Sequence, residues 1–306
     1  MRLFPTSLRT AVRPRLACEI AADGILAAGS PDAELPLDAT AYVPQQDTIA
    51  AGLNSPMFRD RIGVAAALKS ALEAVSPNGR DWTLILPDAC TRILILDFDT
   101  LPAKPQEILP LVRFRLRRMI PFDADTAAVS YQLLKPSGVT NGSPVQVLAA
   151  AMPAEVREEL ESLLRESDRE PGTLLPASLA ALAAVPETGS HLLVHTGENS
   201  ITTTITSNGE LLLYRRTEYS EGELGERAQA VLIAAAYYED TLHEPLQEVW
   251  VAGLETVEIL RSHLEQDGEW RVPLRSLIAS DAFSAGAVPT GVAASRFTSV
   301  VGALRG

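Results

Sequence analysis

The sequence predicts an α/β protein with mixed sheets and helices packed against them. Three observations lead to this fold class. A hairpin of short apolar strands followed by a helix occupies residues 15–75. A similar arrangement of strands and a long helix recurs at residues 191–242. Between them, residues 83–152 follow the order strand, strand, helix, strand, strand, which has no counterpart in the second half.

Composition limits the classes of function. Of 306 residues, 46% are hydrophobic and 21% are charged, which is typical of a globular chain with a sizeable core. The net charge of -13 disfavours broad binding to nucleic acid or anionic lipid, although it permits a local basic patch. Cys18 and Cys90 are far apart, so we expect free thiols in a reducing compartment. The four histidines lack metal-binding spacing, and no apolar run is long enough to span a bilayer.

The first half begins with strands at residues 15–20 and 24–30, joined by a turn at residues 22–24. Residues 33–60 are rich in Pro, Asp and Asn, which indicates a loop with one weak strand. Apolar residues at helical spacing predict a helix over residues 64–75, and Pro77, Asn78 and Gly79 end it.

The central block contains two β-rich segments, residues 83–86 and 92–98, on either side of a Pro–Asp turn. A helix is predicted over residues 104–119, because Pro105 suits a first turn and Pro121 ends the pattern. Its buried side should be formed by Leu111, Val112, Phe114 and Leu116. Further strands at 128–134 and 144–152, joined by a turn at 137–143, precede helices at 153–168 and 174–185.

The second half begins with three consecutive strands, within residues 191–219. Asn208 and Gly209 separate the last two, and this pair is the strongest hairpin signal in the chain. A long helix at 223–242, an apolar strand at 248–254 and a helix at 255–267 follow. Residues 272–277 suggest a short strand or loop, and residues 291–305 a helix of small residues.

Several segments together resemble the PilM family, actin-like proteins of type IV pilus assembly. Residues 101–102 (Leu-Pro), 120–122 (Ile-Pro-Phe) and 130–134 (Ser-Tyr-Gln-Leu-Leu) occupy the places of the family's "lP", "iPF" and "Dy.vl" segments. The ending, residues 301–306, resembles its closing "GLALR" helix. The order of elements agrees from about residue 16 to residue 306. The related cytoplasmic domain of GspL, from type II secretion, continues into a membrane helix that this chain does not show.

The resemblance implies a two-domain, actin-like (ribonuclease H-type) α/β fold with an inserted small subdomain and mixed sheets. The first domain would cover residues 1–190, with the insert at about residues 81–151. The second would cover residues 191–285, and residues 286–306 would return to the first domain as a helix. Members of the family lie in the cytoplasm beneath the inner membrane and bind the short cytoplasmic N-terminus of a bitopic partner, PilN.

The resemblance also indicates where a nucleotide site would lie. Actin-like ATPases hold phosphate and Mg²⁺ with Asp and Gly at two hairpin turns. The family motif "GIDIG" aligns with residues 17–21, where Glu19 replaces the Asp and Ala21 the second Gly. The motif "lvDiG" aligns with residues 193–197, where His195 replaces the Asp before Thr196 and Gly197. Imidazole is a poor ligand for Mg²⁺, which prefers oxygen.

The adenosine-side glycine turn corresponds to residues 251–254, where only Gly253 is kept. These departures predict a degenerate cleft, no enzymatic activity and no cofactor. ATP with Mg²⁺ in the same cleft is the alternative.

An arginine cluster in the inserted block predicts a partner surface. On a helix, Arg113 and Arg117 share a face and Arg118 extends it. Such a patch suits an acidic partner or the membrane surface. The alternative is a solvated face whose arginines pair with Glu107 or neighbouring acids.

Three functions remain to be compared. The first is a scaffold that binds a PilN-like peptide in a groove between the first domain and its insert. The second is an ATP-binding actin-like ATPase. The third is a division scaffold similar to FtsA, which residues 291–306 disfavour because they lack the basic, bulky apolar character of a membrane anchor.

Overall fold

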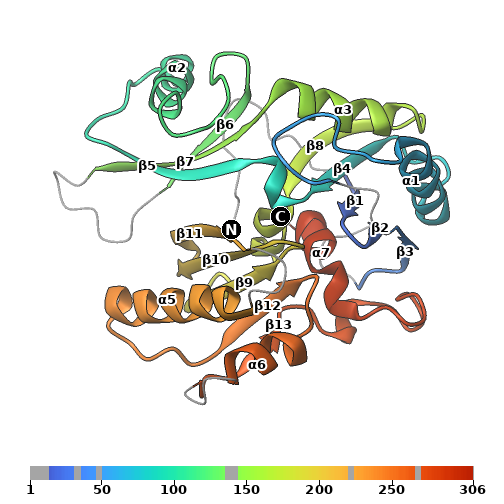
Figure 1. Cartoon of the computed structure of the whole chain (residues 1–306). Helices are drawn as coiled ribbons and strands as arrows, with labels where there is room; N and C mark the ends of the chain where they lie inside the picture. Colours follow the sequence, from blue (N-terminus) through green and yellow to red (C-terminus); the bar gives the residue numbers. More distant parts are fainter. Residues whose placement is uncertain are drawn as a thin grey trace.

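The computed structural model describes residues 14–30, 36–45, 50–134, 144–219, 224–265 and 270–305 (Figure 1). Its strands form three sheets. The first has the order β3 (Ala39–Pro44), β2 (Gly24–Gly29), β1 (Leu16–Ala21), β4 (Asp81–Leu86) and β8 (Glu170–Pro176). The second has the order β11 (Glu210–Glu218), β10 (Ser200–Ser207), β9 (Ser190–Thr196), β12 (Val249–Gly253) and β13 (Leu274–Ser276). The third has the order β5 (Arg92–Phe98), β7 (Val145–Met152) and β6 (Ala128–Leu133).

The two five-stranded sheets are built in the same way. In each sheet, the first three strands pair with one another in antiparallel fashion. The third strand, β1 or β9, pairs in parallel with the fourth, and the fourth pairs in parallel with the fifth. The helices are α1 (Arg61–Val75), α2 (Pro105–Leu116), α3 (Ala154–Arg165), α4 (Ala177–Leu182), α5 (Leu224–Leu242), α6 (Val257–Glu265) and α7 (Thr298–Arg305). The predicted mixed α/β class, with a repeated half and a separate block, is confirmed.

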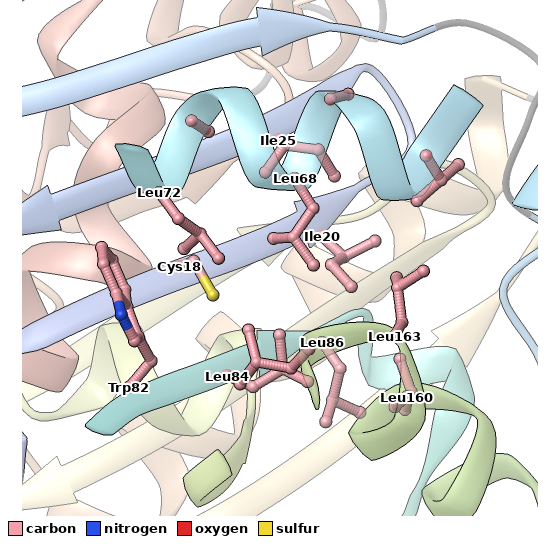
Figure 2. Close-up of a cluster of buried hydrophobic side chains, with 14 of the residues drawn as sticks. Cys18, Ile20, Ile25, Leu68, Leu72, Trp82, Leu84, Leu86, Leu160 and Leu163 are labelled. Atoms are coloured by element: carbon pink, nitrogen blue, oxygen red, sulfur yellow. The ribbon is translucent and has the colours of Figure 1, made fainter. Parts of the chain in front are cut away.

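One face of the first sheet packs against α1 and α3. Alternate residues of β1 and β4, such as Cys18, Ile20 and Leu84, point into a cluster with Leu68 of α1 and Leu160 of α3, as Figure 2 shows. Asp60 caps α1, because its side chain accepts a hydrogen bond of 2.9 Å from the backbone N–H of Gly63. This cluster is the largest apolar core, and it fixes the position of the β1–β2 hairpin.

The opposite face of the first sheet packs against α4 and α7. Ala17 and Leu26 lie in one cluster with Phe297, Val300 and Val301 of the C-terminal segment. A second cluster joins α4 to the second sheet through Leu182, Leu193 and Ala252. Both five-stranded sheets are therefore joined by buried apolar contacts from α4 and α7.

The third sheet forms a separate small layer with α2, which lies at the outer edge of the molecule (Figure 1). Val112 and Leu116 of α2 are buried against Val147 and Ala149 of β7. Among the described residues, no helix combines the length and apolar character that crossing a bilayer requires.

Four details differ from the prediction. Residues 170–176 form strand β8, where a helix was expected from residue 174, because a short apolar run suits either element. Phe114 is 63% exposed, although it was expected on the buried side of this helix. The final α-helix begins at Thr298, after a 3₁₀ turn.

Strand β4, within the range expected for the insert, pairs with β1 and β8, so the third sheet begins at Arg92. The turn expected at residues 137–143 lies outside the described residues.

The contact between α4 and α7 generates a prediction about Gly302. A Cβ at Gly302 would lie 2.0 Å from the carbonyl oxygen of Ala180, so Gly302→Ala must push the two helices apart. We expect a loss of at least about 2 kcal/mol in the free energy of unfolding, measured by chemical denaturation. Gly225→Ala is the matched control, because open space surrounds Gly225 and its change should stay within about 0.5 kcal/mol. Equal effects of both substitutions would contradict this packing.

Candidate functional site in the cleft between the two halves

A cleft of about 390 Å³ lies where the β1–β2 hairpin of the first sheet faces the β9–β10 hairpin of the second. All six residues that the sequence placed in a nucleotide cleft line it, namely Glu19, Ala21, His195, Thr196, Gly197 and Gly253. Residues from five further segments complete the wall, including Asp88, Arg92, Arg216, Tyr219 and Arg296. The sequence therefore identified the location of the cleft, and its chemistry depends on the side chains around it.

Glu19 is a buried carboxylic acid at the bottom of the cleft. Its side chain is 4% exposed, and among the described residues its Oε2 atom has no hydrogen-bond partner. Burial raises the pKa of Glu19 to about 7, although Arg296 opposes the shift and Asp23 and Asp88 add to it. Near neutral pH, Glu19 is therefore protonated in a large fraction of the molecules.

Arg296 enters the same cleft from the C-terminal segment. Its Nε donates a hydrogen bond of 3.0 Å to Oδ2 of Asp23, and its Nη2 donates to Oδ1 of the same carboxylate. Burial lowers the pKa of Arg296, but Glu19 and Asp23 more than compensate and raise it overall. Asp23 lies in the two-residue turn of the β1–β2 hairpin, so a fixed guanidinium closes this end of the cleft.

His195 faces the cleft from the second sheet and lies beside Asp88. Its Nδ1 is 3.9 Å from Oδ2 of Asp88, which is too long for a hydrogen bond. Burial lowers the pKa of His195, Asp88 opposes this shift and Arg296 adds to it. The Asp88 carboxylate instead accepts hydrogen bonds from the N–H of Ser178 at 3.0 Å and from Oγ1 of Thr202 at 2.7 Å. Asp88 therefore joins the first sheet, α4 and β10.

Gly253 and Thr196 have structural roles in the second sheet. Gly253 has φ +101°, and a Cβ there would lie 2.1 Å from the carbonyl oxygen of Thr196, the residue that it pairs with. Oγ1 of Thr196 accepts a hydrogen bond of 2.8 Å from the N–H of Glu255 and donates one of 3.2 Å to Ala252. Close packing of β9 against β12 therefore requires glycine at position 253. The hydroxyl of Thr196 already accepts and donates hydrogen bonds within the second half of the chain.

An ion pair lies directly after residues 251–254, the segment that corresponds to the adenosine-side glycine turn. Arg227 of α5 pairs with Glu255, and its guanidinium carbon lies 4.1 Å from the ring centre of Tyr219. His263 of α6 lies beside the same carboxylate, with its Nδ1 4.0 Å from Oε2 of Glu255. Tyr219 in turn donates to the carbonyl oxygen of Gly197 at 3.1 Å. These side chains hold the second hairpin turn against α5 and α6.

Comparisons with known proteins bear on the fold. No protein-family model matches the sequence, and no curated protein matches it. A structure described as the PilM-PilN type IV pilus biogenesis complex is similar over 95% of this chain and 99% of the other, with a TM-score of 0.70 and 18% sequence identity. The cytoplasmic domain of EpsL, an inner membrane component of the type II secretion system of Vibrio cholerae, is similar over 79% and 82%, with a TM-score of 0.50 and 11% identity.

This chain has a PilM-like, actin-like fold. At 18% identity the likeness extends to the fold, so the chemistry of the cleft must be judged from the residues in it.

Two acidic side chains in and beside the cleft of this PilM-like fold are bound to other residues of the chain. Among the described residues, no group of three or more His, Cys, Asp or Glu is arranged to hold a metal ion. The carboxylate of Asp23 is taken by Arg296, and that of Asp88 by Ser178 and Thr202. A partly protonated Glu19 is a weaker metal ligand than a free Asp.

The predicted arginine surface proves to be partly structural. Arg113 is half-buried and donates to the carbonyl oxygens of Ala124 and, at 2.9 Å, Ala127. Arg117 forms two hydrogen bonds of 2.9 Å with Asp125, and Arg118 is exposed. Arg113 therefore fixes the segment before β6, whereas Arg117 and Arg118 remain at the surface.

Sequence reasoning missed Asp88, Asp23 and Arg296. Asp88 was interpreted only as part of a Pro–Asp turn, and Asp23 only as part of a hairpin turn. A signal for Arg296 existed, because it is the one charged residue between Asp281 and Arg305. A lone charge in such an apolar stretch usually has a partner when it is buried.

The raised pKa of Glu19 predicts a pH dependence of stability. Glu19 binds a proton more tightly in the folded chain than in the unfolded one, so its contribution is greatest at low pH and is lost as pH rises from about 4.3 to about 7. The loss should reach about 3 kcal/mol. Glu19→Gln should remove this component, measured as the difference in the free energy of unfolding between pH 5 and pH 8.

Glu158→Gln provides the control, since Glu158 is exposed on α3. The idea fails if the wild type and Glu19→Gln lose stability equally over this pH range.

Proposed function

We propose that this chain is a non-catalytic scaffold of a type IV pilus or related secretion assembly at the inner membrane. It binds the short cytoplasmic N-terminal peptide of a bitopic, PilN-like partner, and so lies on the cytoplasmic side of that membrane. The PilM-like fold over nearly the whole chain supports this role. The observation that carries the proposal is an apolar groove between the first and third sheets.

The groove has a volume of about 180 Å³ and a mostly apolar lining. One side is formed by Ala128, Val129 and Ser130 of β6. Leu174 and Pro176 of β8 lie among the residues that face them. Among the strands that the structure describes, β6 pairs only with β7 and β8 only with β4, so both lie at the ends of their sheets.

This arrangement suits an extended peptide. An edge strand offers backbone N–H and C=O groups to a new strand, and apolar pockets select alternate side chains. Arg157 of α3 is the charged residue among the lining residues, and its Nε lies 3.7 Å from Oε1 of Glu161, so an acidic group in the peptide would compete with Glu161 for this guanidinium. A segment with alternating apolar residues and one acid is the expected ligand.

The first test is binding of the partner's peptide. The N-terminal cytoplasmic peptide of the PilN-like protein from the same genome should bind the full chain in a fluorescence anisotropy titration. Ser130→Trp should weaken binding at least about tenfold. Ser130 is an exposed residue of the groove, and the indole side chain would fill the space that the peptide needs. Leu133→Trp is the matched control, since Leu133 lies on the same strand outside the groove and is 46% exposed. Peptide that binds both variants as tightly as the wild type would exclude this groove.

The second test concerns the cleft. We propose that it holds no nucleotide, because Arg296 lines it and is bound to Asp23, and the Asp88 carboxylate is bound to Ser178 and Thr202. A ligand with a Kd of about 10 μM would raise the free energy of unfolding by about 2.7 kcal/mol at 1 mM. We expect no such increase with MgATP, and no heat of binding in calorimetry, whereas an active actin-like ATPase should give both. Saturable, Mg²⁺-dependent binding would support an ATPase instead.

A further inference from the structure

The C-terminal end of α2 carries an exposed surface that neither the cleft nor the groove uses. We call Phe114, Arg117, Arg118 and Met119 the α2 tip. Phe114 is 63% exposed and Met119 is 50% exposed, and both arginines are exposed as well. Figure 1 places α2 at the outer edge of the molecule, with the third sheet behind it. An aromatic ring and a thioether are thus presented to solvent between two guanidinium groups.

The charge of this region is opposite to that of the rest of the chain. Residues 105–119 contain four arginines and one acid, Glu107, whereas the whole chain has a net charge of -13. Arg113 donates to backbone carbonyl oxygens, and so does Arg115, which lies 2.8 Å from the carbonyl oxygen of Asp97. Only Arg117 has a carboxylate partner, Asp125, among these hydrogen bonds. Asp123 and Asp125 follow within six residues of Met119 and offset part of this charge, so the positive charge is concentrated at the exposed Arg118.

Arg117 also supports the exposed ring. Its guanidinium carbon lies 6.0 Å from the ring centre of Phe114, and its bonds to Asp125 hold it in place. Arg118 lies four residues after Phe114, in the turn that follows α2. The tip is therefore an ordered arrangement of one ring and two cations.

We propose that the α2 tip binds the surface of an anionic lipid bilayer. Phe114 and Met119 enter the boundary between head groups and acyl chains, while Arg117 and Arg118 pair with lipid phosphates. A protein partner fits less well, because two exposed apolar side chains offer far less than the roughly 800 Å² per side of a standard protein interface. The contact goes beyond the peptide-binding role, since it involves the chain and the lipid alone.

The test is flotation of the purified full chain with vesicles, in the absence of any partner. Vesicles of phosphatidylcholine with phosphatidylglycerol should carry the chain, whereas phosphatidylcholine alone should not, and added salt should release it. Arg117→Gln with Arg118→Gln should weaken binding roughly fivefold for each arginine. Phe114→Ser should weaken it about tenfold.

Two matched controls change the same chemistry elsewhere. Arg261→Gln with Arg271→Gln removes two exposed arginines, and Ile233→Ser removes an exposed apolar residue of α5. Both should bind vesicles like the wild type. Arg118→Gln alone is a milder variant that leaves the Arg117–Asp125 pair intact.

Three results would overturn the proposal. They are no binding to anionic vesicles, equal binding by the tip variants and the wild type, and equal losses in the tip variants and the controls. Tip variants that keep vesicle binding but lose a protein partner would assign the surface to an acidic protein. None of these results affects the peptide titration, so failure of the lipid contact and failure of the groove can be told apart.

Discussion

The ion pair between the buried Arg296 and the partly exposed Asp23 determines how the C-terminal segment meets the first hairpin. It joins the C-terminal segment to the first hairpin across 273 positions of sequence. Removing one partner from such a pair leaves an unpaired buried charge, which is strongly destabilising. The pair also sets the state of the cleft, because the guanidinium supplies the positive charge that the nearby carboxylates require. This contact therefore ties the segment before α7 to the first hairpin and moderates the rise in the pKa of Glu19 that burial causes.

A cleft of this kind usually needs a ligand to hold its walls together, and here the chain supplies the contacts itself. The apolar clusters around α4 and α7 join both sheets, and Asp88 links Ser178 to Thr202 across the same boundary. Arg227, Glu255 and Tyr219 do the same on the side of the second hairpin. Folding can thus keep the closed arrangement without the binding energy of a nucleotide.

The sequence predicted the local elements well, because strands, turns and helices leave short-range signals. The hairpin at Asn208 and Gly209 and the helix after Asp60 are examples. It also located the cleft, through positions that should carry Asp and Gly. The partners of those positions could not be predicted, since Arg296 and Asp23 are remote in sequence and meet only through the packing of α7. Phe114 was placed in the core because helical spacing shows which residues share a face and not what covers that face.

The third sheet and the edge of the first sheet provide a second surface, apart from the cleft. The repeated halves leave β8 as an unpaired edge, and β6 of the third sheet lies across the groove from it. The same small layer carries α2, which is followed directly by Arg117 and Arg118. Arg113 fixes the segment between α2 and β6 by binding its carbonyl oxygens, so the exposed tip of α2 and the groove strand are held in one rigid unit. A ligand at either surface would therefore meet a preformed site, and would lose less conformational entropy on binding than one that had to order a loop.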